Sequence, residues 1–207
     1  YAIQTAASTS TVHYNGTMAQ TVAGITYSNL IFSNGGASAK TLNASSTVNG
    51  DITINIGSSV NASSYTINLG GNWSNAGTFV PATSTVVLNG ISKTINGATT
   101  FNKVTVYGDY AVINNSDITY NDLLLVTSTG IYSAGGGTAT VNGDLTNSGS
   151  LTSTGITTFT GTSLQTIRLI NALVSTSTGV VNFNGNVAPV LNSTSAPTFA
   201  NLNINNT

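Results

Sequence analysis

The sequence contains no cysteine and no glutamate, and only three prolines among its 207 residues. Without cysteine, neither a disulfide framework nor a thiolate metal site can hold the fold together. The chain must therefore be stabilised by backbone hydrogen bonds and by side-chain packing. We expect its stability to be insensitive to reductants and to metal chelators.

Charge is almost as scarce. Charged residues make up 4% of the chain, with a formal net charge of −1, whereas about a quarter of a typical soluble domain is charged. The cations are scattered singly and form no basic patch for phosphates or anionic lipids. The composition therefore argues against nucleic-acid binding and electrostatic membrane binding, and it favours self-association.

Small polar residues dominate instead. Thr, Ser, Asn and Gly together fill 109 of the 207 positions, and the hydrophobic fraction is 40%. Because the apolar residues are mostly β-branched or aromatic, there is material for a core of strands. In residues 52–56, isoleucines alternate with polar residues, which is typical of a half-buried strand. No stretch has a helical period, so we predict an all-β protein with almost no helix.

The chain repeats itself. The segment 9–16 returns as 83–90, at an offset of 74, and the segment 71–79 returns as 143–151, at an offset of 72. We therefore expect one continuous repeat domain over residues 1–207. Its super-repeats, set by these two offsets, span approximately 9–82, 83–156 and, incompletely, 157–207.

Two folds could hold such strands. Tandem small β-sandwich modules would need bulkier cores than the scattered aromatic residues supply. A solenoid instead stacks coils of about 20 residues, each too small to be stable alone. We predict a single-chain β-solenoid, a parallel β-helix, with tandem β-sandwich modules as the alternative.

Seven Asn-Gly pairs separate the strands. Both residues accept the positive φ that tight turns require, so we expect positive φ at these corners. The pairs stand at 15–16, 34–35, 49–50, 89–90, 96–97, 142–143 and 184–185.

Aromatic residues recur at equivalent repeat positions. Tyr14, Phe159 and Phe183 share one position, and Tyr27, Phe101 and Phe199 share another. We expect stacked rings in the core rather than an exposed platform for sugars.

Residues 47–54, 69–79 and 141–149 resemble the Gly/Asn/Thr-rich β-strand repeats of long secreted surface proteins, above all those of Bacteroidetes-type bacteria. They are more loosely similar to autotransporter passengers and filamentous adhesins. The resemblance covers nearly the whole chain. It implies a parallel β-helix, extracellular display and a role as stalk, adhesin or fibre.

Few residues are available for chemistry. The single histidine, His13, aligns with Val87 and Thr158 in the sister repeats, which indicates a surface position without a catalytic role. The five aspartates form neither a calcium-binding tandem nor a paired-carboxylate motif. We therefore predict no enzymatic activity, no cofactor and no metal site.

The leading functional hypothesis is a secreted structural protein of the cell surface, a stalk or fibre subunit. The alternative is an adhesin or glycan-binding module of a larger surface protein. Ice binding ranks lower, because the Thr-x-Thr pairs it would need, such as those at 83–85 and 138–140, recur irregularly.

We expect the ends of the repeat array to lack a polar or helical cap, and open solenoid ends template association. We therefore predict end-to-end self-association, or contact with flanking repeats of a longer chain. The predicted contact residues are Tyr1, Ile3, Leu202 and Ile204. Extracellular glycans are a further candidate partner, and we expect neither nucleic-acid binding nor membrane insertion.

Overall fold

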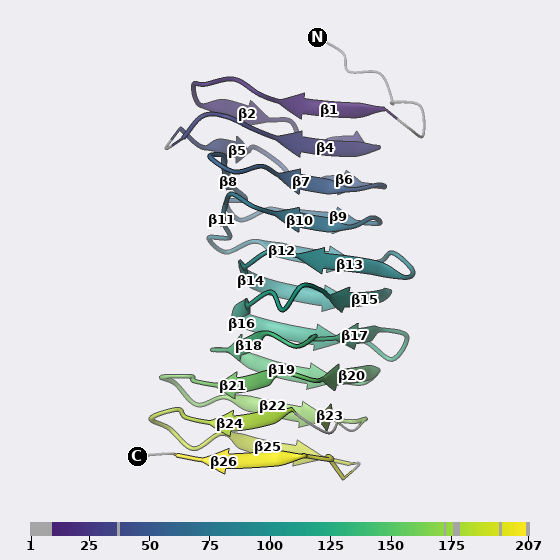
Figure 1. Cartoon of the computed structure of the whole chain (residues 1–207), viewed down its shortest axis with the longest axis vertical. Coiled ribbons are helices and arrows are strands. Elements are labelled where there is room, and N and C mark those ends of the chain that lie inside the picture. Colours follow the sequence, from purple (N-terminus) through teal and green to yellow (C-terminus); the bar gives the residue numbers. More distant parts are fainter. Residues whose placement is uncertain (1–9, 37, 172, 176–178, 195, 206–207) are drawn as a thin grey trace.

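The computed structural model describes residues 10–36, 38–171, 179–194 and 196–205, and the backbone of residues 173–175. Its strands stack one above another in a tall column, with the amino-terminal coils at the top of Figure 1 and the carboxy-terminal coils at the bottom. In this described part every strand pair is parallel and no helix is present, so none could cross a membrane. The predicted β-solenoid is confirmed, and the β-sandwich alternative is wrong.

Each coil has three faces, and the register partners Tyr27, Val48 and Leu69 mark the step from one coil to the next. Face A is the nine-stranded sheet. Its strands are β1 (Thr11–Tyr14), β4 (Asn29–Phe32), β7 (Ile52–Ile54), β10 (Trp73–Asn75), β13 (Lys93–Asn96), β15 (Asp109–Val112), β17 (Ile131–Ser133), β20 (Ser150–Ser153) and β23 (Leu173–Ser175).

Face B begins as a separate four-stranded sheet. These strands are β2 (Gln20–Val22), β5 (Lys40–Leu42), β8 (Ser59–Asn61) and β11 (Thr78–Val80). Face B continues through the first halves of β14 (Thr99–Val106) and β16 (Ile118–Val126), then through β18 (Thr138–Val141), β21 (Ile156–Phe159), β24 (Val180–Phe183) and β26 (Asn201–Ile204).

Face C starts with β3 (Thr26–Tyr27), β6 (Ser46–Val48), β9 (Thr66–Leu69) and β12 (Thr85–Leu88). It continues through the second halves of β14 and β16, then β19 (Asp144–Asn147), β22 (Thr166–Leu169) and β25 (Val190–Ser193). The long strands β14 and β16 turn the corner between faces B and C without a loop. A register shift between Phe101 and Lys103, a β-bulge, makes this bend.

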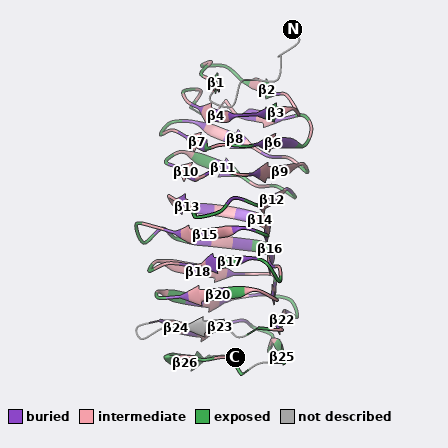
Figure 2. Ribbon diagram, turned by 90° about the vertical axis from the view of Figure 1, so that its right-hand side faces the viewer, coloured by how far each residue is buried: buried purple, intermediate pink, exposed green. Residues whose placement is uncertain are grey.

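Inward-facing side chains stack into apolar columns. Leu69, Leu88, Val106 and Val126 are successive register partners on face C, and each is fully buried. Burying one such side chain contributes about 1.5–3 kcal/mol. The alternation of buried and less buried residues along each strand, visible as purple and pink segments in Figure 2, is the predicted period of two.

The aromatic rings at equivalent repeat positions are buried or packed against the core, as predicted; they are Tyr14, Tyr27, Phe101, Phe159, Phe183 and Phe199. They do not all stack on their repeat equivalents. Phe159 stacks on Phe183, with ring centroids 5.1 Å apart, because the two are register partners in β21 and β24. Tyr14 stacks instead on Phe32, its partner in the next coil, at 5.8 Å. Coil neighbours, rather than super-repeat equivalents, therefore determine the ring stacks.

The super-repeat does not coincide with whole coils. It is longer than three coils and shorter than four, as the step from Val48 to Leu69 shows. The segment 71–79 accordingly runs from face A to face B, whereas its counterpart, 143–151, runs from face C to face A. Equivalent segments lie on different faces, so each sequence motif moves around the solenoid axis from one super-repeat to the next.

The prediction about Asn-Gly corners is wrong for five of the seven pairs, since positive φ occurs only at 34–35 and 96–97. Four of the other five glycines, all except Gly16, lie instead against the backbone of the preceding coil. A Cβ at Gly143 would lie 1.9 Å from the backbone oxygen of Asp122 in the preceding coil, and one at Gly90 would lie 2.3 Å from that of Gly70. Close approach of successive coils, rather than turn conformation, requires glycine there.

Candidate functional site

The predicted end contacts are only partly within the described structure. Tyr1 and Ile3 lie outside the described residues. Leu202 and Ile204 belong to β26, where they continue the inward columns of Val181 and Phe183. Their side chains are 44% and 67% exposed, whereas Val181 and Phe183 are buried. The structure thus places apolar residues on the open edge of β26, and contact with another chain stays a prediction.

His13 lies on the outer side of β1, exposed, with Nε2 hydrogen-bonded to the Ser33 hydroxyl. Its repeat equivalents Val87 and Thr158 also point outward, on faces C and B. The predicted surface position is confirmed.

Three of the five aspartates tie one coil to the next. In each, Oδ1 accepts a backbone N–H of the following coil: Asp51 from Asn72 at 2.7 Å, Asp117 from Thr138 at 2.8 Å and Asp144 from Thr166 at 2.7 Å. Asp122 forms an ion pair with Lys103 at 3.3 Å, and Asp109 accepts from Ser92 at 3.4 Å. The carboxylates therefore serve mainly as structural acceptors, each worth about 1 kcal/mol.

Buried polar side chains also join neighbouring coils, from inside the corners. Lys40 is fully buried and donates to the carbonyl oxygens of Gly16 and Asn34, at 3.0 and 2.8 Å. Burial lowers the pKa of its ammonium group. The Tyr110 hydroxyl oxygen lies 2.8 and 2.9 Å from two carbonyl oxygens of earlier coils, and burial raises its pKa to about 12. Both groups are inaccessible to a substrate, so their role is to hold the backbone of neighbouring coils together through these hydrogen bonds.

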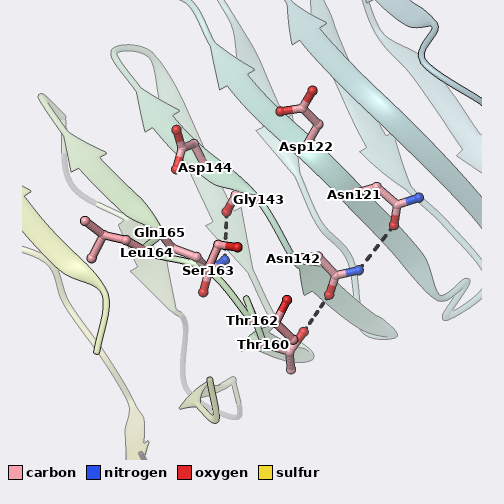
Figure 3. A pocket seen from close by; sticks show the side chains of 10 residues that line it. All are labelled: Asn121, Asp122, Asn142, Gly143, Asp144, Thr160, Thr162, Ser163, Leu164 and Gln165. Carbon is pink, nitrogen blue, oxygen red and sulfur yellow. Dashed lines mark hydrogen bonds between the residues drawn. The ribbon is translucent and has the colours of Figure 1, made fainter. Parts of the chain in front are cut away.

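An open recess of about 580 Å³ lies at the corner between faces B and C (Figure 3). It exists because successive corners differ in length. The corner between β18 and β19 has two residues, whereas the loop between β21 and β22 spans residues 160–165 and forms a wall beside it. The recess is lined by Asn121, Asp122, Asn142, Gly143, Asp144, Thr160, Thr162, Ser163, Leu164 and Gln165.

A ladder of polar side chains crosses the recess. Asn142 Nδ2 donates to Asn121 Oδ1 at 3.2 Å, and the Thr160 hydroxyl donates to Asn142 Oδ1 at 2.6 Å (Figure 3). The ionisable lining groups are Asp122 and Asp144, and both already have the partners given above. In the described ranges, no three His, Cys, Asp or Glu side chains come together to hold a metal ion. The recess is suited to hydrogen-bonding a polar ligand rather than to acid–base chemistry.

Face B also carries two outward columns of uncharged polar side chains through its last six strands, which we call the Thr/Asn array. The first column consists of Thr100, Thr119, Thr140, Thr158, Asn182 and Asn203. The second column lies at the corner with face C: Asn102 and Asn121 stand at the bend of β14 and β16, and Asn142, Thr160, Asn184 and Asn205 each directly follow a strand. Every position in both columns is Thr or Asn, whereas the outward column on the other side of the first one includes Asp117, Ile156 and Val180.

Sequence reasoning missed this array because it looked for Thr-x-Thr. The two pairs it singled out do not share a face, since Thr85 lies on face C and Thr140 on face B. The available signal was Thr-x-Asn with an inward apolar residue between, at 100–102, 119–121 and 140–142.

Comparison with known proteins identifies no relative: no family model, no curated protein and no solved structure matches the chain.

Proposed function

We propose that the chain is a secreted structural element of the cell surface, a stalk or fibre segment whose stacked coils provide length. The observation that carries the proposal is the use of the polar side chains. Aspartates, a lysine and a tyrosine that would otherwise be available for chemistry bind the backbone of neighbouring coils. The resemblance of residues 47–54, 69–79 and 141–149 to secreted surface repeats supports the extracellular location.

End-to-end association is part of this proposal. Its support is β26, a strand with exposed apolar Leu202 and Ile204 that pairs with β24 along one edge and, among the described residues, with no strand along the other. Such an edge is a template for another strand. The partner is a second copy of the chain or the flanking repeats of a longer one.

Sedimentation velocity over a range of protein concentrations tests the association. We expect the chain to form end-to-end oligomers and Ile204→Asp to remain a monomer, because a charge cannot be buried at the junction without a partner. Ile56→Asp is the matched control, since Ile56 is 84% exposed on the side of the column. Monomers at every concentration, or equal effects of both substitutions, would contradict the proposal.

The recess favours a second candidate function, the adhesin that binds a glycan. Hydroxyl, amide and carboxylate groups converge there on about 580 Å³ of open space, which suits a polyhydroxylated ligand. A glycan array tests it with Ser163→Trp, which fills the recess, against Ser128→Trp on an exposed loop elsewhere. Binding lost only in Ser163→Trp supports this function, and no binding by the unmodified chain refutes it.

A further inference from the structure

We propose that face C is a lateral contact site at which two copies of the chain pair in antiparallel orientation. This site goes beyond end-to-end association, because it lies on the side of the column rather than at its ends. Two observations carry the inference: a pair of outward leucines on β16, and opposite charges placed on either side of that pair.

The two leucines lie in the middle of face C. Leu123 and Leu125 alternate with the buried Leu124 and Val126 along β16, and each is half-buried. In the described part of the chain, every strand belongs to one of the three faces and none packs on their outer side. Only another molecule can therefore remove these leucines from water, and removing apolar surface from water is favourable.

Opposite charges flank this apolar pair. The register partners of Leu123 are Lys103 in the preceding coil and Asp144 in the following coil. A second copy, turned by 180° about an axis parallel to β16, runs its coils in the opposite direction. Its Asp144 then faces Lys103 of the first copy, and its Lys103 faces Asp144, while Leu123 and Leu125 face their own counterparts. Face C is thus complementary to itself under a two-fold axis.

Both charged groups can take a second partner. The Lys103 ammonium group has three N–H donors, and its ion pair with Asp122 at 3.3 Å leaves donors for another carboxylate. The same ion pair neutralises Asp122 at the edge of the contact. Asp144 is exposed and accepts the Thr166 N–H through Oδ1, so that Oδ2 can accept from a lysine of the second copy.

The coils further from the axis fit the same arrangement. Val87 lies two coils before Leu125 in its column, and Arg168 lies two coils after it. Arg168 of one copy therefore faces Val87 of the other. The apolar part of the arginine side chain can cover the valine while its guanidinium group stays in water. The remaining facing positions of these strands are all threonines, namely Thr85, Thr105, Thr146 and Thr166.

A parallel pair fits less well. Turning the second copy about the solenoid axis instead would place Lys103 opposite Thr105 and Asp144 opposite Thr146. Neither charge would then face a charge of opposite sign. Charge complementarity therefore selects the antiparallel arrangement.

A single contact of this kind is weak. From β12 to β25, six strands each contribute two outward residues to face C, whereas a stable interface takes about 20–30 residues from each partner. We therefore expect single chains to pair only transiently. In the end-to-end fibre of the proposed function, the contact recurs in every chain and its contributions add, so that face C joins fibres side by side.

Chemical cross-linking of single chains tests the pairing. All chains carry Ile204→Asp, so that the result does not depend on end-to-end association, and each has one introduced cysteine, since the chain has none of its own. In the antiparallel pair Thr105 of one copy faces Thr146 of the other, across the roughly 10 Å that separates packed sheets. We expect a bis-maleimide reagent of that span to join a Thr105→Cys chain to a Thr146→Cys chain. The control replaces Thr146→Cys with Thr158→Cys, at a half-buried outward threonine of face B, and should give little product.

Charge reversal tests the orientation. Lys103→Asp in both chains places aspartates opposite each other, and Asp144→Lys in both chains places lysines opposite each other. Each should lower the yield of cross-linked dimer at least about tenfold. Lys103→Asp in one chain with Asp144→Lys in the other makes both facing pairs opposite in charge again, so the yield should return. Circular dichroism verifies that each variant is folded.

A yield that returns only in the mixed pair supports antiparallel contact at face C. Equal yields from all charge variants would overturn the proposal, as would equal product with Thr158→Cys or no product from chains with unchanged charges. Failure of end-to-end association has a different result, namely monomers of the unmodified chain in sedimentation with cross-linking at face C unchanged.

Discussion

Faces B and C share the strands β14 and β16 and bury similar residues, yet they present different chemistry to the solvent. Inward, Tyr120 on face B and Leu124 on face C are both buried. Outward, Thr119 continues a column of threonines, whereas Leu125 continues a column that includes Val87 and Arg168. Two faces of one solenoid can thus have the same interior and unrelated surfaces.

This difference distinguishes the positions at which folding restricts the side chain from the positions at which it does not. Inward positions must be apolar, or polar with a hydrogen-bond partner as Lys40 is, because each coil covers the next. Outward positions are constrained only where a side chain caps a neighbouring backbone N–H, as Asp144 does for Thr166. The uniform outward column of Thr100, Thr119, Thr140 and Thr158 on face B is therefore not a requirement of the core.

A substitution at the corner between faces B and C should lower the free energy of unfolding most. Gly143→Ala would place a methyl group 1.9 Å from the Asp122 backbone oxygen, so the coils must separate locally. We expect the free energy of unfolding to fall by about 3 kcal/mol, measured by denaturant titration. Gly57→Ala has open space around its Cβ and a positive φ, so it should cost only about 1 kcal/mol. Equal losses would show that coil contact does not set the requirement.

The next largest loss of stability is expected at a buried tyrosine in the interior of face A. Tyr110→Phe removes a hydroxyl that serves buried backbone groups, and we expect a loss of about 2 kcal/mol at neutral pH. The pKa of Tyr110 is raised from 10.0 to about 12 in the fold. Its contribution is therefore fully present below pH 10 and is lost as the pH rises from 10 towards 12.

Thermal unfolding between pH 9 and pH 12 checks this dependence. The unmodified chain should lose stability more steeply with pH than Tyr110→Phe. Tyr107→Phe, at a tyrosine that is 52% exposed, should leave the profile unchanged. Identical slopes in all three proteins would contradict the role assigned to Tyr110.

The sequence was sufficient to predict the parallel solenoid, because alternation and internal repeats both follow directly from it. It did not predict which residues meet. Coil length varies locally, and the super-repeat is not a whole number of coils, so Thr100, Thr119 and Thr140 can be aligned only once the corners are known. The recess depends on the loop of residues 160–165 being longer than the neighbouring corner, and that difference has no distinctive sequence motif.

We expect the smallest changes in the free energy of unfolding at the two aspartates of the recess, and we expect these two changes to differ. Asp144→Ala removes the acceptor for the Thr166 N–H and should cost about 1 kcal/mol. Asp122→Ala breaks an ion pair whose side chains are 42% and 54% exposed, so we expect a change within about 0.5 kcal/mol. Chemical denaturation of both variants is the measurement. A larger loss in Asp122→Ala would show that the ion pair, not the coil cap, stabilises this corner.

The register of face B is the claim on which the Thr/Asn array depends, and disulfide trapping tests it most directly. The chain has no native cysteine. Thr119→Cys combined with Thr140→Cys places two thiols on register partners, with Cα atoms about 4.8 Å apart, within the range that a disulfide spans. We predict rapid intramolecular oxidation of this pair and none of Thr119→Cys with Thr146→Cys, whose residues lie on different faces. Failure of the first pair to close, or equal closure of both, would contradict the stacking described for face B.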